Sequence, residues 1–215
     1  MNKDDNLFSP RFSKKDVTIH KKQRIFKKYF AIDEYELSYP RFDGKEQAIV
    51  QREIFERDSN AVAILAYDIA HDEVALIEQF RPGALSDPIT PWLIEIVAGI
   101  IDKGEQPIES AIREVKEEIG LKIEKDDLYF FSDVYPSPGG ISEKVSIYIA
   151  NANLEHLSNH GGLDCENEDI RVFKVSLDDA YNQVIYGRIN NSAAMIALMF
   201  LKHHKEEIVQ HFATR

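Results

Sequence analysis

The segment from Gly99 to Leu121 combines an apolar stripe with a row of glutamates, and this combination restricts the fold more than any other feature. Apolar residues recur after Pro107 at three- and four-residue steps, which is typical of a helix with one side on a core: Ile108, Ala111, Ile112, Val115 and Ile119. Glu114, Glu117 and Glu118 follow the spacing that gathers side chains on a different side of the same helix. The segment therefore predicts a helix that is seated on a core and carries clustered carboxylates.

Three carboxylates at this spacing have two interpretations. Like charges three or four residues apart repel by a few tenths of a kcal/mol per pair, so the cluster is tolerated on a solvated helix face. A divalent cation between the carboxylates turns the repulsion into coordination. Mg²⁺ in particular takes carboxylate oxygens and keeps waters and substrate phosphates as its remaining ligands. The residues alone allow a solvated acidic face or a metal site.

The fixed residues of this segment follow the pattern Gly-x5-Glu-x7-Arg-Glu-U-x-Glu-Glu-x-Gly-U, in which U is aliphatic, and the chain resembles the Nudix box at every one of them. These positions are Gly99, Glu105, Arg113, Glu114, Val115, Glu117, Glu118, Gly120 and Leu121. In that family the box is a loop, a helix and a loop. Its glutamates bind divalent metal for the attack of water on a nucleoside diphosphate linked to another moiety. The resemblance favours the metal site.

The resemblance also implies a role for each box residue. Metal ligands would come from Glu114 and Glu118, helped by Glu117, which we also count as catalytic, and by the backbone carbonyl of Ala98. The metal would be Mg²⁺, with Mn²⁺ as an alternative. The remaining roles are structural: Arg113 holds the carboxylates or forms an ordinary helix ion pair, Glu105 braces the loop, and Gly99 and Gly120 supply backbone freedom.

Net charge and cysteine content limit the cellular compartments and the classes of binding partner that suit this chain. The chain of 215 residues has a net charge of −11, which argues against a broad nucleic-acid-binding surface and against an anionic membrane surface. Cys165 is its one cysteine, so an intrachain disulfide is impossible and a reducing compartment is favoured. We find no signal peptide and no apolar run of membrane-spanning length, and we expect a cytoplasmic protein.

Periodicity predicts strands along most of the chain and two helices after the box helix. Alternation and β-branched or aromatic residues predict strands over 17–37 (more than one), 47–57, 61–69, 73–80, 92–97, 129–135, 145–150 and 170–175. A turn is expected at 40–44, and residues 61–69 and 73–80 read as a hairpin. Helices are expected from about Leu177 to Tyr186, capped by Ser176, and from Asn191 or Ser192 onward.

These elements predict an α/β protein with a mixed sheet packed between helices, because strands and helices do not alternate regularly. The resemblance implies the same Nudix-type α/β/α sandwich. We expect residues 58–215 to form the Nudix hydrolase domain. Residues 1–57 are expected to add a small antiparallel β-sheet appendage for dimerisation and substrate contacts, since a three-stranded sheet is only marginally stable alone.

Segments outside the box resemble one Nudix subgroup, the ADP-ribose pyrophosphatases, with Pro138 at the place of that subgroup's proline. These segments are 52–57, 78–81, 137–140 with Glu143, and 166–170. By resemblance, Arg52 and Arg81 contact charged or ribosyl portions of the substrate, and Tyr29 or Phe30 stacks on adenine; a core position for either ring is the alternative. The other predicted substrate-binding residues are Glu53, Ile100, Ser137, Gly139 and Glu143.

The polar, glycine-bearing stretch from Ser158 to Asp169 is long enough to close over a substrate. A carboxylate on this loop would then reach the attacking water and act as general base. We assign that role to Glu166, with Glu168 as an additional metal contact or the alternative base. An exposed acidic loop without a catalytic role is the other interpretation.

The resulting expectation is Mg²⁺-dependent hydrolysis of the pyrophosphate of ADP-ribose to AMP and ribose 5-phosphate by a homodimer with swapped N-terminal regions. One alternative keeps the mechanism but takes a nucleotide sugar of the GDP-mannose type. Another is a non-catalytic sensor that binds ADP-ribose. Regulators of that kind usually have a damaged box or an added basic DNA-binding domain, and this chain has neither.

Overall fold

The computed structural model describes residues 7–45, 47–163, 165 and 167–214. The chain divides into two compact units, which we call the N-terminal unit and the main unit. The N-terminal unit comprises Met1–Asp58 together with Ser137–Ser142, and the main unit comprises Ser59–Pro136 with Glu143–Arg215. The sequence predicts residues 58–215 as one domain, whereas the segment Ser137–Ser142 groups with the N-terminal unit.

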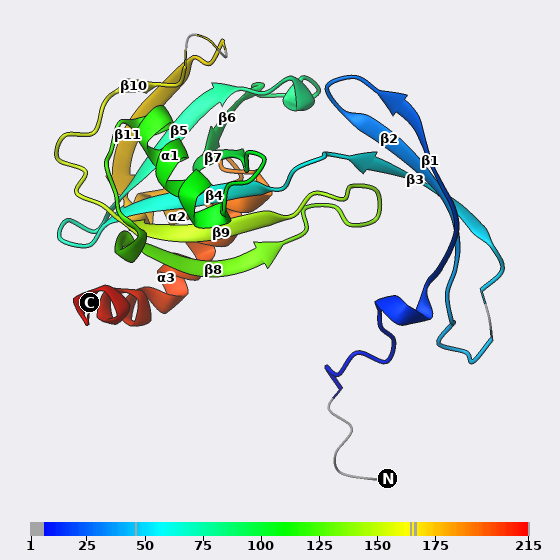
Figure 1. The fold of residues 1–215 in the computed structure, drawn as a ribbon. Helices are drawn as coiled ribbons and strands as arrows, with labels where there is room; N and C mark the ends of the chain where they lie inside the picture. The colour runs from blue at the N-terminus through cyan, green and yellow to red at the C-terminus, as the bar shows by residue number, and fades with distance from the viewer. Residues whose placement is uncertain (1–6, 46, 164, 166, 215) are drawn as a thin grey trace. The chain divides into compact units, whose positions relative to one another are not determined.

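A three-stranded antiparallel sheet forms the N-terminal unit, as predicted (Figure 1). Its strands lie in the order β1 (Thr18–Lys27), β2 (Ala31–Ser38) and β3 (Val50–Glu56). Backbone bonds hold the segment 137–142 on β3: the Phe55 N–H donates to the Gly140 carbonyl at 2.8 Å, and the Ser142 N–H donates to the Phe55 carbonyl at 3.1 Å. This pairing explains why the segment belongs to the N-terminal unit.

The main unit is built on a mixed sheet. Its strands are β4 (Ala61–Asp68), β5 (Glu73–Phe80), β6 (Trp92–Glu95), β7 (Val97–Ile100), β8 (Leu128–Val134), β9 (Val145–Asn151), β10 (His160–Gly161) and β11 (Ile170–Ser176). They lie in the order β10-β11-β5-β4-β9-β8, with β6 paired to β5 and β7 paired to β4. The β4–β9 pair is parallel, and the other pairs in this sheet are antiparallel.

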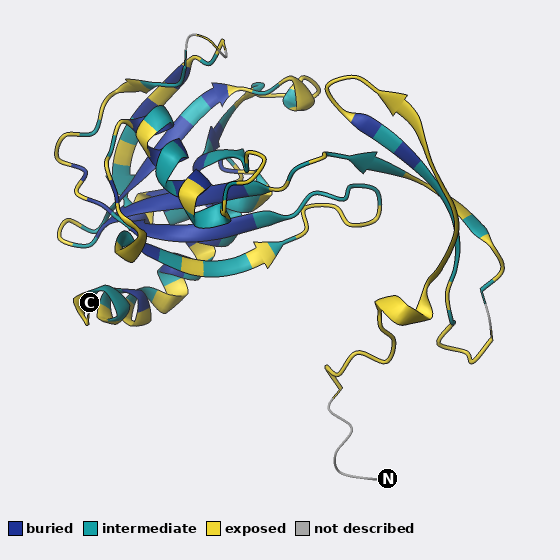
Figure 2. Cartoon of the chain, viewed as in Figure 1, coloured by how far each residue is buried: buried dark blue, intermediate teal, exposed yellow. Residues whose placement is uncertain are grey.

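Helices cover both faces of this sheet. The alternation along β4 separates them, because Val62 and Ile64 pack with residues of α1 (Pro107–Ile119). Ala63 and Leu65, on the opposite face, pack with residues of α2 (Leu177–Ile185) and α3 (Ser192–Ala213). Both faces of β4 are therefore buried, as the dark central strands of Figure 2 show. The predicted α/β/α sandwich with a mixed sheet is confirmed.

The prediction of one strand over residues 92–97 is wrong. The chain changes partner at Ile96, so β6 pairs with β5 and β7 pairs with β4. The cause lies in β4 and β5, which pair with each other only over 67–68 and 73–74 and then diverge. Each strand needs a new neighbour beyond that point. The run from Trp92 to Val97 is apolar except for Glu95 and contains no turn residue, so its sequence does not mark the exchange.

The predicted cap of α2 is present, and Asn191, one of the two residues expected to open α3, caps that helix. Ser176 Oγ accepts a hydrogen bond from the Asp179 N–H at 3.0 Å, and Asn191 Oδ1 accepts one from the Ala194 N–H at 3.1 Å. Each cap satisfies a backbone donor that the first turn of a helix leaves without a partner. Over the part of the chain described here, no helix is both long and apolar enough to cross a membrane.

Candidate active site

The candidate site lies where α1 packs against β7. Ala111, Val115 and Ile119 of α1 are fully buried, and they orient the helix so that its glutamates face β7. The Glu118 carboxylate accepts a hydrogen bond from the Ala98 N–H at 3.1 Å and is only 2% exposed. Ala98 is thus bound to Glu118 through its amide, while its carbonyl is the group that the box predicts as a metal ligand.

Gly99 leaves room beside its backbone for a neighbouring side chain. Its φ is not in the positive region, so the expected need for backbone freedom is wrong at this position. A Cβ on Gly99 would overlap the Glu114 carboxylate, so a side chain at this position requires that carboxylate to move. Gly120 is the glycine with special backbone geometry, since it ends α1 with φ of 72° in the left-handed region.

Arg113 ties the box together. Its Nη1 donates to Glu114 at 2.7 Å and to Glu117 at 3.0 Å. Its Nη2 donates to the Ile100 carbonyl at 3.0 Å, and Nε and Nη2 donate to the two oxygens of Glu105 at 3.2 and 3.1 Å. One guanidinium therefore links the helix, β7 and the loop between them, which is more than an ordinary helix ion pair does.

Burial and neighbouring charges shift the pKa values of the box carboxylates in opposite directions. Burial raises the pKa of Glu118 well above its usual value, and the negative charges of Glu114 and Glu168 raise it further. Burial also raises the pKa of Glu114 despite its bond to Arg113. Hydrogen bonds from Arg113, then from Ser110, lower the pKa of Glu105 to about 2. Glu105 is held as a charged brace, while Glu114 and Glu118 are carboxylates whose charge is poorly compensated.

The loop that follows β10 reaches the C-terminal end of α1. A Cβ on Gly161 would overlap the carbonyl of Glu118, and the Gly162 N–H donates to the Glu117 carbonyl at 3.4 Å. This approach brings Glu168 close enough for its charge to act on Glu114 and Glu118. Glu166, the predicted general base, lies outside the described residues.

The described side chains form no group of three or more histidine, cysteine, aspartate or glutamate residues arranged to hold a metal ion. Arg113 Nη1 lies between Glu114 and Glu117, and Glu118 is turned to the Ala98 amide. The structure thus brings the predicted ligands to one side of α1 with a guanidinium among them.

Arg81 follows directly after β5 and belongs to the same side of the sheet as α1. Its Nε donates to Glu95 Oε2 at 2.8 Å, and its Nη2 lies 2.7 Å from the same oxygen. The positive charge of Arg81 partly offsets the rise in the pKa of Glu118. Arg81 is therefore the predicted substrate contact that the main unit places beside the box carboxylates. Glu143, another predicted contact, is half-buried just before β9.

The other predicted substrate contacts lie in the N-terminal unit. Tyr29 and Phe30 form the turn between β1 and β2, where Tyr29 is 75% exposed and Phe30 packs against Phe55 with ring centroids 4.7 Å apart. Arg52 and Glu53 are exposed residues of β3. Two more contacts, Ser137 and Gly139, lie in the segment paired with β3.

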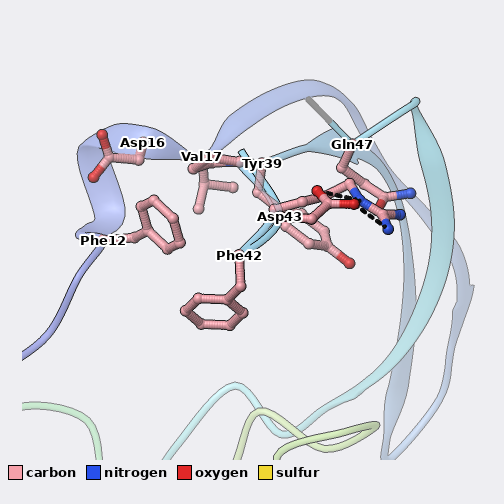
Figure 3. Close-up of a pocket in the computed structure, with 9 residues that line it drawn as sticks. Phe12, Asp16, Val17, Tyr39, Phe42, Asp43 and Gln47 are labelled. Carbon is pink, nitrogen blue, oxygen red and sulfur yellow. Dashed lines mark hydrogen bonds and ion pairs between the residues drawn. The ribbon is translucent and has the colours of Figure 1, made fainter. Parts of the chain in front are cut away.

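A cavity of about 610 Å³ lies wholly within the N-terminal unit (Figure 3). It is lined by Phe12, Asp16, Val17, Tyr39, Pro40, Arg41, Phe42, Asp43 and Gln47. The rings of Phe12 and Phe42 lie 5.3 Å apart, and Arg41 is paired with Asp43. None of the predicted site residues lines it.

Comparison with known proteins decides the family. The NUDIX domain matches residues 58–195. The chain belongs to the Nudix family. An ADP-ribose pyrophosphatase of Escherichia coli strain K12 is 41% identical over 215 residues, covering 99% of this chain and 100% of that protein. An ADP-ribose pyrophosphatase of Haemophilus influenzae is 34% identical over 202 residues (93% and 92%), and a GDP-mannose pyrophosphatase of Cronobacter sakazakii is 29% identical over 188 residues (87% and 95%).

The sequence analysis did not single out Glu95 of this Nudix chain. Glu95 is half-buried on β6 and is the partner of Arg81, although it lies outside the box. The signal was present in Trp-Leu-Ile-Glu-Ile-Val, because a lone carboxylate in an apolar strand has to find a partner when it is buried. Its partner could not be named before the register of β5 and β6 was known.

Proposed function

We propose that this Nudix protein hydrolyses the pyrophosphate of ADP-ribose to AMP and ribose 5-phosphate in a Mg²⁺-dependent reaction. The observation that carries the proposal is the pair of buried carboxylates, Glu114 and Glu118, held where α1 meets β7 in a complete Nudix box. The identity of 41% over 215 residues to a protein named ADP-ribose pyrophosphatase supports the choice of substrate.

The donor set fits a hard divalent cation. Carboxylate and carbonyl oxygens are the ligands that Mg²⁺ prefers, and the chain offers Glu114, Glu117, Glu118 and the Ala98 carbonyl, with Glu168 in addition. Burial of Glu114 and Glu118 raises their pKa values, so a cation at this place relieves an electrostatic cost. Bound Mg²⁺ supplies neutralisation of the diphosphate and a lower pKa for a coordinated water; Mn²⁺ is the alternative ion.

Protein groups then orient the substrate and move the proton. The loop carboxylate Glu166, or Glu168 in its place, accepts a proton from the attacking water. In this scheme Glu117 also serves catalysis, and Arg113 holds it and Glu114 in place through the bonds described above. Because water is the nucleophile, the enzyme forms no covalent intermediate.

Substrate recognition is assigned to residues outside the helix. Arg81 contacts the charged portion of the substrate in the main unit, where Ile100 and Glu143 are further contacts. From the N-terminal unit, Arg52, Glu53, Ser137 and Gly139 are the corresponding contacts. Of the two aromatic candidates, Tyr29 is the better base platform, because Phe30 is already packed on Phe55.

A substrate panel tests the proposal. With Mg²⁺ present, kcat/KM for ADP-ribose is expected to exceed that for GDP-mannose, and a coupled phosphatase reports AMP as it is released. A higher kcat/KM for GDP-mannose would establish the nucleotide-sugar alternative, which the more distant relative supports. Binding of ADP-ribose without turnover would establish a sensor instead.

We further propose a homodimer with swapped N-terminal regions, in the cytoplasm. The N-terminal unit exposes many apolar side chains for its size: Val17, Ile19, Ile25, Phe26, Tyr29, Phe42 and Ile49. Patches of this kind mark protein interfaces. The single cysteine agrees with a reducing compartment. Sedimentation is expected to give twice the chain mass of 24.7 kDa, and a fully active monomer would contradict the dimer.

A further inference from the structure

We infer that Glu95 is a positioning residue, which fixes the Arg81 guanidinium so that its free side is available to the diphosphate of the substrate. The inference rests on the proposed function, because it takes Arg81 as a substrate contact. It adds a residue outside the Nudix box, on β6, whose role is exerted through Arg81.

One oxygen of Glu95 gathers three donor groups. Oε2 accepts from Arg81 Nε at 2.8 Å, lies 2.7 Å from Arg81 Nη2, and accepts from Gln79 Nε2 at 3.4 Å. The Glu95 side chain is only 13% exposed and Gln79 is 6% exposed, so both are held by packing. Arg81 itself is 38% exposed and depends on this contact for its direction.

The strand register puts this group on the face of the sheet that α1 covers. Ala75 and Ile77 of β5 pack in the same core cluster as α1, and Gln79 and Arg81 continue that alternation. Glu95 lies opposite Ile77 in the β5–β6 pair, so its side chain is on this face too. Arg81 is therefore aimed along the face that carries Glu114 and Glu118.

Glu95 binds one edge of the Arg81 guanidinium. Both polar contacts that the Arg81 side chain makes with described residues go to Glu95, through Nε and Nη2, and the Nη1 side keeps its donors for a ligand. An Arg fork of this kind suits the planar, paired oxygens of a phosphate. Glu95 also gives Arg81 a carboxylate partner away from Glu114 and Glu118, so the cation does not compete with metal for those two.

Glu95→Gln tests the inference, because it keeps the size of the side chain and removes the charge that orients Arg81. We expect KM for ADP-ribose to rise roughly tenfold, with kcat within about twofold of the wild type, since the lost contact serves bound substrate and transition state alike. Binding of ADP-ribose in EDTA, where no turnover occurs, should weaken by the same factor. Glu95→Asp, which keeps the charge but shortens the reach, should also raise KM.

Glu78→Gln is the matched control. Glu78 lies on β5 too, on the opposite face, and accepts from Arg171 at 2.8 Å and from Arg188 at 2.6 Å. It is a carboxylate with arginine partners that has no place in the proposed site. Its replacement should leave KM and kcat unchanged. Thermal unfolding of every variant separates a loss of stability from a change in binding.

A double-mutant cycle decides whether Glu95 acts through Arg81. In an Arg81→Ala background, Glu95→Gln should change KM no further. Full additivity of the two effects, or an unchanged KM in Glu95→Gln alone, would overturn the inference while leaving the proposed function intact. A wild-type protein that neither binds nor hydrolyses ADP-ribose would overturn the proposed function and this inference together.

Discussion

The carboxylate of Glu114 lies against the backbone of Gly99, in the space that any side chain at position 99 would occupy. Gly99 is part of β7 and Glu114 is on α1, so the absence of a side chain at position 99 leaves room for this carboxylate between strand and helix. The first residue of the box is thereby coupled to a predicted metal ligand on the box helix. This contact explains a glycine that needs no unusual backbone angle.

Gly99→Ala is expected to displace the Glu114 carboxylate. A shift of about 1 Å at a reacting centre lowers rates by roughly 100-fold, and we expect kcat to fall by that order. Steady-state kinetics with Mg²⁺ and ADP-ribose measures it. Gly83→Ala is the control, because no atom lies within 4 Å of a Cβ at that position. Normal kcat in Gly99→Ala would show that the contact is dispensable.

Glu105 is expected to stabilise the fold at neutral pH and to lose this effect in acid. Its pKa is lowered from 4.5 to about 2, first by Arg113 and then by Ser110. Because the folded pKa is depressed, this contribution to stability is complete above about pH 4.5 and is lost as the pH falls toward 2. Glu105→Gln should therefore flatten the decline of the free energy of unfolding over this window. Urea unfolding at several pH values measures it, and parallel curves for wild type and variant would refute the role.

Asn191 is expected to stabilise α3 and its attachment to β6. Its Oδ1 caps the Ala194 N–H at 3.1 Å, and its Nδ2 donates to the Ile94 carbonyl at 2.6 Å. Asn191→Ala should lower the free energy of unfolding by about 1–2 kcal/mol. The neighbouring Asn190→Ala serves as control, since its side chain makes one exposed contact at 3.3 Å. Equal stability of the two variants would argue against the cap.

The elements that could be predicted from the sequence are those fixed by local patterns. The steps from Ile108 to Ile119 defined α1, and Ser176 and Asn191 marked the starts of α2 and α3, because a cap acts within its own turn. The resemblance added the reaction class and the sandwich. These conclusions depend on short-range spacing or on a long fixed motif, and both can be recognised in a single sequence.

What could not be predicted depends on contacts between distant segments. The exchange of partners at Ile96 follows from the divergence of β4 and β5, which no local pattern records. The role of Gly99 follows from the approach of Glu114, and the partner of Arg81 follows from the register that brings β6 beside β5. These relations appear only when strands and helix are in place.

Glu118→Gln probes the proposed metal site, because the amide can still accept a hydrogen bond from the Ala98 N–H but lacks the charge that we propose binds metal. The pKa of Glu118 is raised in the folded state, so its stabilising contribution is lost as the pH rises and the charged form opposes folding at neutral pH. In EDTA, the variant should therefore unfold at the same temperature as the wild type or above it.

The decisive measurement is kcat of Glu118→Gln with ADP-ribose and saturating Mg²⁺, made alongside thermal unfolding with and without the metal. We expect a folded variant without measurable turnover, whose unfolding temperature no longer rises with Mg²⁺ as that of the wild type does. Near-normal kcat in a folded Glu118→Gln variant would contradict it.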